Sequence, residues 1–201
     1  MELLILGVTG RTGRRVLAAA QAASHRVTTF GRRPAAGAER TLVGAFGDAA
    51  FAAEVRAADA VLSCLASTNR DPVCSRAAKA VLTADPGARF VTVAGAGVDR
   101  PEDRKGPGDR AVGLAMRLVA RGMLADRQRE VDMLAASRAR WTALRPPRLT
   151  EGRATGRWRF SFDRPAATWI DRDDLAAAML AVLEDEGMAG RAPFVSAEPR
   201  A

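Results

Sequence analysis

Three glycines near the N-terminus have the spacing that suits the phosphate bridge of a dinucleotide. Gly7, Gly10 and Gly13 follow an apolar segment at residues 3–6, which reads as a buried strand, and a helical pattern begins directly after them. Gly7 permits a sharp exit from the strand, Gly10 lets the backbone approach a pyrophosphate, and Gly13 lets the helix pack closely against the strand. Amide groups at the helix start, aided by the helix dipole, then face the phosphates. The sequence therefore predicts a dinucleotide-binding turn.

Polar side chains are interleaved with these glycines. Thr9 and Thr12 supply hydroxyl groups for further hydrogen bonds, and Arg11 supplies a positive charge. The alternative is an ordinary tight turn. The position between a strand and an alanine-rich helix favours the dinucleotide turn, because that is the context which the motif requires.

Strand and helix patterns alternate along the rest of the chain. Short apolar strands separated by longer helices indicate a parallel sheet that is covered on both faces. We therefore expect an α/β protein with a doubly wound parallel sheet (a Rossmann fold), three α/β/α layers and a single domain over residues 1–201. Substrate-side loops are expected at about 95–110 and 146–168. The expected strands are residues 3–6, 26–30, 41–43, 60–63, 89–93, 141–144 and 193–196, and the expected helices are residues 11–23, 48–57, 72–83, 110–136 and 171–186.

Two single residues mark where helices begin and bend. Asp171 is a good N-cap for the last helix, because a short carboxylate can accept from the free amides of the first turn. Gly122 is expected to kink or divide the long helix at residues 110–136.

The positive charge of the chain does not point to nucleic acid. Of 201 residues, 31 are Lys or Arg and the net charge is +8, but aromatic residues make up only 5%. The basic residues are mostly arginine and are scattered with acids between them, which indicates a solvated surface rather than a nucleic-acid-binding face. No nucleic-acid partner is expected.

Neither a metal site nor a membrane segment is expected. Cys64 and Cys74 have no metal-ligand spacing, and two free cysteines fit a reducing, cytoplasmic setting. The apolar start of the chain is too short for a signal peptide. The most apolar helix, at residues 111–125, is interrupted by Arg117 and Arg121 and cannot span a bilayer.

A second cofactor signal follows the expected strand at residues 26–30. The tip of this strand meets the adenosine ribose in this architecture, and binders of the unphosphorylated cofactor usually place an Asp or Glu there. Here no acid stands at the tip, and Arg32 and Arg33 are adjacent. Two guanidinium groups suit a 2′-phosphate, so NADP(H) is predicted in preference to NAD(H), with a basic solvent loop as the alternative.

The remaining cofactor positions follow from the rule that ligands bind at the carboxyl ends of parallel strands. Asp48 is placed to meet the adenine edge, and it can also serve as the N-cap of the next helix. Small or apolar residues at three other strand tips let the cofactor lie flat toward the nicotinamide. They are Cys64, Leu65 and Ala66, then Ala94 and Gly95, and finally Pro146.

These features resemble the atypical short-chain dehydrogenase/reductases, of the NAD(P)H-binding, NmrA-like and flavin or biliverdin reductase kind. The resemblance covers nearly the whole chain, and it implies a Rossmann fold, bound NADP(H) and hydride transfer to a small planar or carbonyl-like substrate. It rests on the segments at residues 7–13, 31–34, 47–48, 130–149 and 170–176.

The chain departs from the family pattern at the catalytic positions. Many short-chain dehydrogenases use a serine and a Tyr-x-x-x-Lys pair, but this chain contains no tyrosine. Ala-Gly-Ala at residues 94–96 stands where the serine is expected, and Gly-Met at residues 122–123 stands near the tyrosine position. Asp126 or Arg127 falls near the lysine position. Tyrosine-assisted carbonyl reduction is therefore excluded.

Two explanations of the chemistry stay open. A flavin or another conjugated acceptor needs little acid help, and cofactor positioning then supplies most of the catalysis. Alternatively, another group donates the proton. The weak candidates for a catalytic role are Asp99, Asp103, Asp126 and Arg127, with bound water as a further donor. For each acid the alternative is a plain surface role.

The second substrate-side loop carries two candidate substrate-binding residues. Arg148 and Trp158 are able to receive a flat, acidic substrate by ion pairing and stacking. The alternative for Trp158 is that it fills the core.

The sequence thus predicts an NADPH-dependent reductase that acts on a small planar or conjugated acceptor such as a flavin, quinone or enone. It is expected to be a monomer or a homodimer. Two alternatives remain: an NAD(P)-binding redox sensor without turnover, and a non-redox isomerase or cyclase on the same scaffold.

Overall fold

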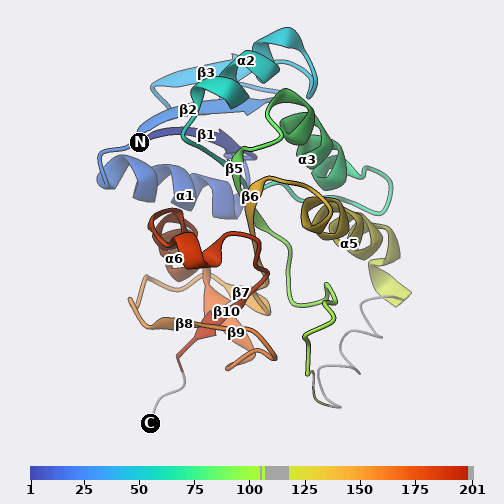
Figure 1. Cartoon of the computed structure of the whole chain (residues 1–201). Helices are drawn as coiled ribbons and strands as arrows, with labels where there is room; N and C mark the ends of the chain where they lie inside the picture. The colour runs from blue at the N-terminus through green and yellow to red at the C-terminus, as the bar shows by residue number, and fades with distance from the viewer. Residues whose placement is uncertain (105, 107–117, 199–201) are drawn as a thin grey trace.

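A six-stranded parallel sheet forms the centre of the protein (Figure 1). The computed structural model describes residues 1–104, 106 and 118–198. The strand order is β3-β2-β1-β4-β5-β6, so the chain winds outward from β1 in both directions. Its strands are β1 (Glu2–Leu6), β2 (Arg26–Gly31), β3 (Arg40–Val43), β4 (Ala60–Ser63), β5 (Arg89–Val93) and β6 (Arg140–Leu144).

Helices cover both faces of this sheet (Figure 1). On one face α1 (Arg11–Ala22) and α6 (Arg172–Glu184) pack against each other and bury one hydrophobic cluster with the strands. On the other face α2 (Ala49–Ala57), α3 (Val73–Ala84) and α5 (Arg121–Ala135) bury a second cluster. Because the central strands are covered on both sides, they read as continuous apolar runs. The predicted doubly wound, three-layer α/β fold is confirmed.

The second substrate-side loop, expected at about residues 146–168, contains strands that the sequence analysis did not predict. It contains β7 (Arg148–Thr150) and β8 (Trp158–Ser161). Strand β7 pairs in parallel with β9 (Trp169–Asp171), and β8 pairs antiparallel with β10 (Phe194–Ala197). These strands have three or four residues, which is too short for a periodic pattern to be recognised in the sequence.

Helix boundaries lie close to Gly122 and Asp171 as expected: Ala120 is a bend between helical residues 118–119 and α5, and Asp171 precedes α6. The long helix predicted at residues 110–136 is described only from residue 118 onward, and α5 begins at Arg121. Gly122 therefore lies in the first turn of α5, where a side chain would place its Cβ 2.6 Å from the Asn69 carbonyl oxygen. Asp171 occupies the predicted N-cap position of α6, but its side chain makes no capping hydrogen bond. Its carboxylate accepts instead from Thr150 and Gly152.

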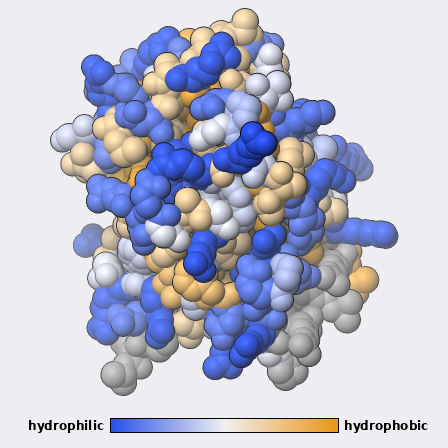
Figure 2. All heavy atoms as spheres, viewed as in Figure 1, coloured by the Kyte–Doolittle hydropathy of each residue, from blue (hydrophilic) through white to orange (hydrophobic). Residues whose placement is uncertain are grey.

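The surface carries hydrophilic side chains across the face seen in Figure 2, with apolar residues between them. Within the described residues, no helix has the length and apolar character needed to cross a membrane.

Among the described glycines, Gly13 leaves the least room for a side chain, and this generates a stability prediction. A Cβ on Gly13 would lie 2.2 Å from the Gly7 carbonyl oxygen. Gly13→Ala should lower the free energy of unfolding by about 1–3 kcal/mol, because the backbone must move to admit a methyl group. Urea denaturation measures this change.

Gly10→Ala is the matched control, because its Cβ would meet the same oxygen at a tolerable 3.3 Å. A loss of stability for Gly13→Ala that does not exceed the loss for Gly10→Ala would contradict this account.

Candidate functional site

The turn between β1 and α1 has the shape of a backbone cradle. Gly7 has φ +80°, and a Cβ there would lie 2.8 Å from the Cys64 carbonyl carbon of the neighbouring strand exit. Gly10 is the N-cap of α1 and has no side chain that could accept from the amides of the first turn. These amides are therefore left for a ligand that carries its own acceptors, as a diphosphate does. The residues present fit the phosphate bridge of a dinucleotide.

The polar residues of this turn lie at the same end of α1. Thr9 is exposed and Thr12 is half-buried. The Arg11 guanidinium donates to Glu151 at 3.1 Å. Contact between Thr9, Arg11 or Thr12 and a dinucleotide stays a prediction.

The tip of β2 leaves its two arginines open to solvent. Arg32 and Arg33 are exposed, and neither forms an ion pair or a side-chain hydrogen bond with any residue that the structure describes. Their charges are therefore not neutralised by the protein itself. This is the state that binding of a 2′-phosphate requires.

Asp48 closes a turn and does not cap α2. It stands at the N-cap position of α2, but no side-chain capping hydrogen bond forms. Its carboxylate accepts from the amide of Ala45 at 2.8 Å. A T-shaped pair of Phe30 and Phe51, with ring centroids 4.9 Å apart, packs beneath this segment, and Phe46 joins it. Asp48 is thus positioned just after β3, above a packed cluster of three phenylalanines.

Backbone hydrogen bonds fix the exits of β4, β5 and β6 to neighbouring strands. The amide of Cys64 donates to Leu6 at 2.9 Å, which fixes the β4 exit beside the glycine turn. The amide of Ala94 donates to the carbonyl of Leu144 at 2.8 Å, and the amide of Ala96 donates to the carbonyl of Pro146 at 2.8 Å. These two bonds join the β5 exit to the β6 exit. These bonds use only main-chain atoms, and most of the side chains at the three exits are short.

The two cysteines are not suited to nucleophilic or redox chemistry. Burial raises the pKa of the Cys64 thiol to about 12, and burial likewise raises the pKa of Cys74 to about 11. Both side chains therefore stay as thiols at neutral pH, which makes them poor nucleophiles.

Asp126 is buried against the N-terminus of α3. Its carboxylate accepts from the Cys74 amide at 3.0 Å and from the hydroxyl groups of Ser67 and Ser75. Burial alone would raise its pKa, but the hydrogen bonds from Ser67 and Ser75 outweigh this effect and hold the pKa below its ordinary value. Asp126 therefore stays charged and fully engaged, and these contacts favour a positioning role over proton donation.

Arg127 is a second buried charge on α5. It forms a 2.8 Å ion pair with Glu130 and donates to the carbonyl of Leu65 at the β4 exit. Glu130 in turn accepts from the Thr92 hydroxyl at 2.8 Å. Burial would lower the pKa of Arg127, but the charge of Glu130 reverses this and raises it. Through these contacts the pair links α5 to the β4 exit at Leu65 and to β5 at Thr92.

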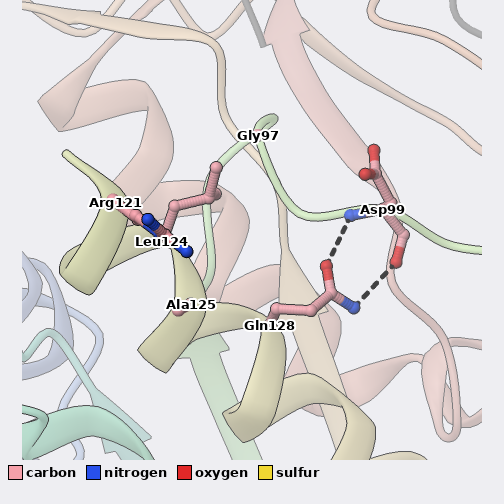
Figure 3. Close-up of a pocket in the computed structure, with 6 residues that line it drawn as sticks. All are labelled: Gly97, Asp99, Arg121, Leu124, Ala125 and Gln128. Atoms are coloured by element: carbon pink, nitrogen blue, oxygen red, sulfur yellow. Dashed lines mark hydrogen bonds between the residues drawn. The ribbon is translucent and has the colours of Figure 1, made fainter. Parts of the chain in front are cut away.

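A cavity of about 260 Å³ lies between α5 and the segment that follows β5 (Figure 3). Gln128 closes its base through two hydrogen bonds to the backbone of Asp99, at 2.9 and 3.1 Å. The carboxylate of Asp99 points away from Gln128 in Figure 3. The other residues that line the cavity are Gly97, Arg121, Leu124 and Ala125.

The described part of the first substrate-side loop is anchored by Arg145, which the sequence analysis did not single out. Arg145 is fully buried and stacks on Phe194 at 3.8 Å. It donates to the carbonyl of Val98 at 3.2 Å and to the carboxylate of Asp103 at 2.7 Å. Asp103 is therefore a loop anchor. The rest of this loop, residue 105 and residues 107–110, lies outside the described residues.

The two candidate substrate-binding residues lie in different environments. Arg148 is exposed. Trp158 is half-buried, packs against the hydrophobic cluster of α1 and α6, and makes a T-shaped contact with Phe160 at 5.0 Å. The contacts of Trp158 favour the alternative in which it fills the core.

Fold and site together define a class: a Rossmann-fold protein whose first βα turn is shaped for a dinucleotide. A model of the NAD(P)H-binding family matches residues 7–186, and the chain belongs to this family. The predicted family is therefore confirmed, and a nicotinamide cofactor is supported. The preference for NADP(H) stays a prediction.

Solved structures of the same fold cover the chain from end to end. A protein of Streptococcus pneumoniae described as an NADH-flavin reductase has a TM-score of 0.80 and 19% identity, covering 98% of this chain and 100% of its own. The anaerobilin reductase ChuY of Escherichia coli O157:H7 has a TM-score of 0.78 and 19% identity, covering 100% of this chain and 99% of its own. A Bacillus halodurans protein described as an NAD-dependent epimerase/dehydratase has a TM-score of 0.78 and 19% identity, covering 98% and 94%. No curated protein matches the sequence of this chain.

The buried carboxylate on α5 generates a prediction about stability and pH. Asp126→Asn should lower the free energy of unfolding at neutral pH by about 2–4 kcal/mol, because the charged acceptor of the α3 amides is lost. Since the pKa of Asp126 is depressed in the folded state, its contribution is present above the ordinary carboxyl pKa and is lost as the pH falls below about 4. Urea denaturation at several pH values measures both effects.

Asp132→Asn is the matched control, because Asp132 lies on the same helix but is exposed. Equal losses for the two variants, or a difference from wild type that does not shrink in acid, would contradict the capping role of Asp126.

Proposed function

We propose that this protein is an NADPH-dependent reductase of a small, flat, conjugated acceptor. The observation that carries the proposal is the backbone cradle at the β1–α1 turn, where a side chain on Gly7 or Gly13 would collide with main-chain atoms and the first amides of α1 have no capping side chain. Membership of the NAD(P)H-binding family supports the same ligand. The diphosphate binds at this cradle, through main-chain amides and the helix dipole.

The rest of the cofactor lies across the carboxyl edge of the sheet. Arg32 and Arg33 at the β2 tip bind the 2′-phosphate, and Asp48 meets the adenine edge. The nicotinamide lies over the short side chains at the exits of β4, β5 and β6. These positions are Cys64, Leu65, Ala66, Ala94, Gly95 and Pro146.

The nicotinamide supplies a hydride when it is bound, and the protein contributes placement more than acid catalysis. The chain has no tyrosine, and both Asp126 and Arg127 are buried in structural contacts. A conjugated acceptor spreads the incoming charge over its ring system, so it needs no strong proton donor next to the reacting atom. The structural neighbours described as flavin and bilin reductases support this class of acceptor. Exposed Arg148 favours an acidic acceptor.

A second candidate function is an NAD(P)-binding redox sensor that does not turn over. The absence of tyrosine from the chain favours the sensor, and so does the Asp126 carboxylate, which is already used in hydrogen bonds such as that from the Cys74 amide. A sensor binds the cofactor tightly but leaves it unchanged in the presence of every acceptor.

The test of the proposed activity is the oxidation of NADPH in the presence of flavins, bilins, quinones and enones. At least one acceptor should accelerate the loss of absorbance of the reduced cofactor above the rate without protein. Tight binding with no turnover on the whole panel would favour the sensor instead.

Cofactor choice gives a separate prediction. Replacing both Arg32 and Arg33 with alanine should weaken NADPH binding by about a hundredfold, because two charge-assisted contacts are lost, while NADH binding changes by less than about threefold. Calorimetric titration of each nucleotide measures the ratio. Equal, small losses for both nucleotides would show that these arginines do not bind a phosphate.

Replacing both Arg153 and Arg157 with alanine is the control for net charge. Both are exposed arginines in the segment between β7 and β8. This variant should leave the NADPH-to-NADH preference unchanged.

A further inference from the structure

One carboxylate holds three guanidinium groups at the start of α1. Glu151, just after β7, accepts from Arg11 at 3.1 Å, from Arg15 at 2.8 Å and from Arg172 at 2.6 Å. Arg11 and Arg15 lie on α1, whereas Arg172 begins α6. The contact joins the segment after β7 to the helix whose first turn forms the cradle.

The three arginines are not held equally. The Arg172 side chain is only 10% exposed, and Arg15 has a second partner in Asp173 at 2.6 Å. Arg11 has a 66% exposed side chain and directly follows the N-cap Gly10. Arg11 is therefore the member of the cluster that can change partners at low cost, and it stands beside the uncapped amides.

Glu151 is held in place by contacts that do not involve Arg11. The segment after Glu151 is fixed on the N-terminus of α6, where Gly152 donates to Asp171 at 2.9 Å and Thr155 donates to Asp174. These carboxylates keep the segment against α6. Glu151 consequently stays near the start of α1 whether or not Arg11 remains bound to it.

The charges at this end of α1 are crowded. Burial lowers the pKa of Arg172, and Arg11 and Arg15 lower it further, although Glu151 partly offsets them. A diphosphate at the cradle brings two negative charges into this group of charges. It attracts Arg11, which Glu151 already holds, and it is repelled by the Glu151 carboxylate.

We propose that the Glu151 carboxylate competes with the cofactor diphosphate for Arg11 and so weakens the binding of both NADPH and NADH. This inference rests on the proposed function, because it needs the dinucleotide at the β1–α1 turn. Since both cofactors carry the same diphosphate, Glu151 sets overall affinity and leaves the choice between them unchanged.

Calorimetric titration of Glu151→Gln with NADPH and with NADH tests the proposal. Both nucleotides should bind about two- to tenfold more tightly than to wild type, with the NADPH-to-NADH ratio unchanged. A merely structural role for Glu151 predicts weaker binding, since losing a contact would loosen the site. Unchanged or weaker binding to a folded variant would overturn the proposal.

Glu2→Gln is the matched control. The side chain of Glu2 is 42% exposed, against 44% for Glu151, and it also pairs with an arginine, Arg26. Glu2 begins β1, whereas the cradle follows the carboxyl end of that strand. Glu2→Gln changes the net charge by the same amount, so it should leave both affinities at the wild-type values. Tighter binding to Glu2→Gln as well would assign the gain to overall charge and overturn the proposal.

Two further measurements keep the test decisive. In Arg11→Gln the Glu151→Gln change should give a clearly smaller gain than in wild type, because only the direct repulsion between Glu151 and the diphosphate is then relieved, and a full gain there would overturn the competition for Arg11. If Glu151→Gln does not fold, Arg11→Gln tests the premise that Arg11 contacts the diphosphate: its affinity for both nucleotides must fall less steeply with added salt than that of wild type, and an unchanged salt dependence would overturn the proposal. Wild-type protein that binds neither nucleotide would refute the proposed function itself, whereas binding without these changes would refute only the role of Glu151.

Discussion

Direct backbone-to-backbone contact at the β1–α1 turn is the constraint on which the rest of the site depends. Gly13 brings the first turn of α1 against the carbonyl of Gly7, and Gly7 itself lies against the β4 exit at Cys64. Any larger residue at these positions would push α1 away from the sheet. The same closeness aims the first amides of α1 over the carboxyl edge, so the requirement for tight packing and the requirement for anion binding are met by one arrangement.

Beyond this turn, buried charges hold the start of one helix and the segments that follow two strands. Asp126 accepts from the amides at the start of α3, and Arg127 holds the carbonyl of Leu65. Arg145 joins the segment after β5 to β10 through Val98 and Phe194. A buried charge that has partners favours one geometry, because an alternative that breaks these contacts leaves the charge unpaired. These contacts hold the segments after β4 and β5 in one arrangement, although many of the side chains there are small.

The sequence predicted the elements that repeat a strong pattern and missed those that depend on distant contacts. The central strands β1 and β4 were recognised because burial on both faces makes them almost wholly apolar. The short strands β7 and β8 were missed because three or four residues held by a partner far along the chain leave no local signal. Asp48 and Asp171 were placed correctly at N-cap positions, but their carboxylates bind backbone amides outside the helix, which spacing alone does not predict.

The arginine-rich composition has a physical reason beyond the surface. The sequence interpretation assigned the basic residues to a solvated surface, and this is wrong for Arg89, Arg127, Arg145 and Arg172, which are all buried. A guanidinium keeps its charge in a buried setting and offers several donors in one plane, whereas a buried lysine tends to lose its proton. Arg145 uses this property by binding two carbonyl oxygens and a carboxylate while stacking on a ring. With two lysines in 201 residues, arginine supplies nearly all the basic side chains of this protein, at the core as well as at the candidate cofactor site.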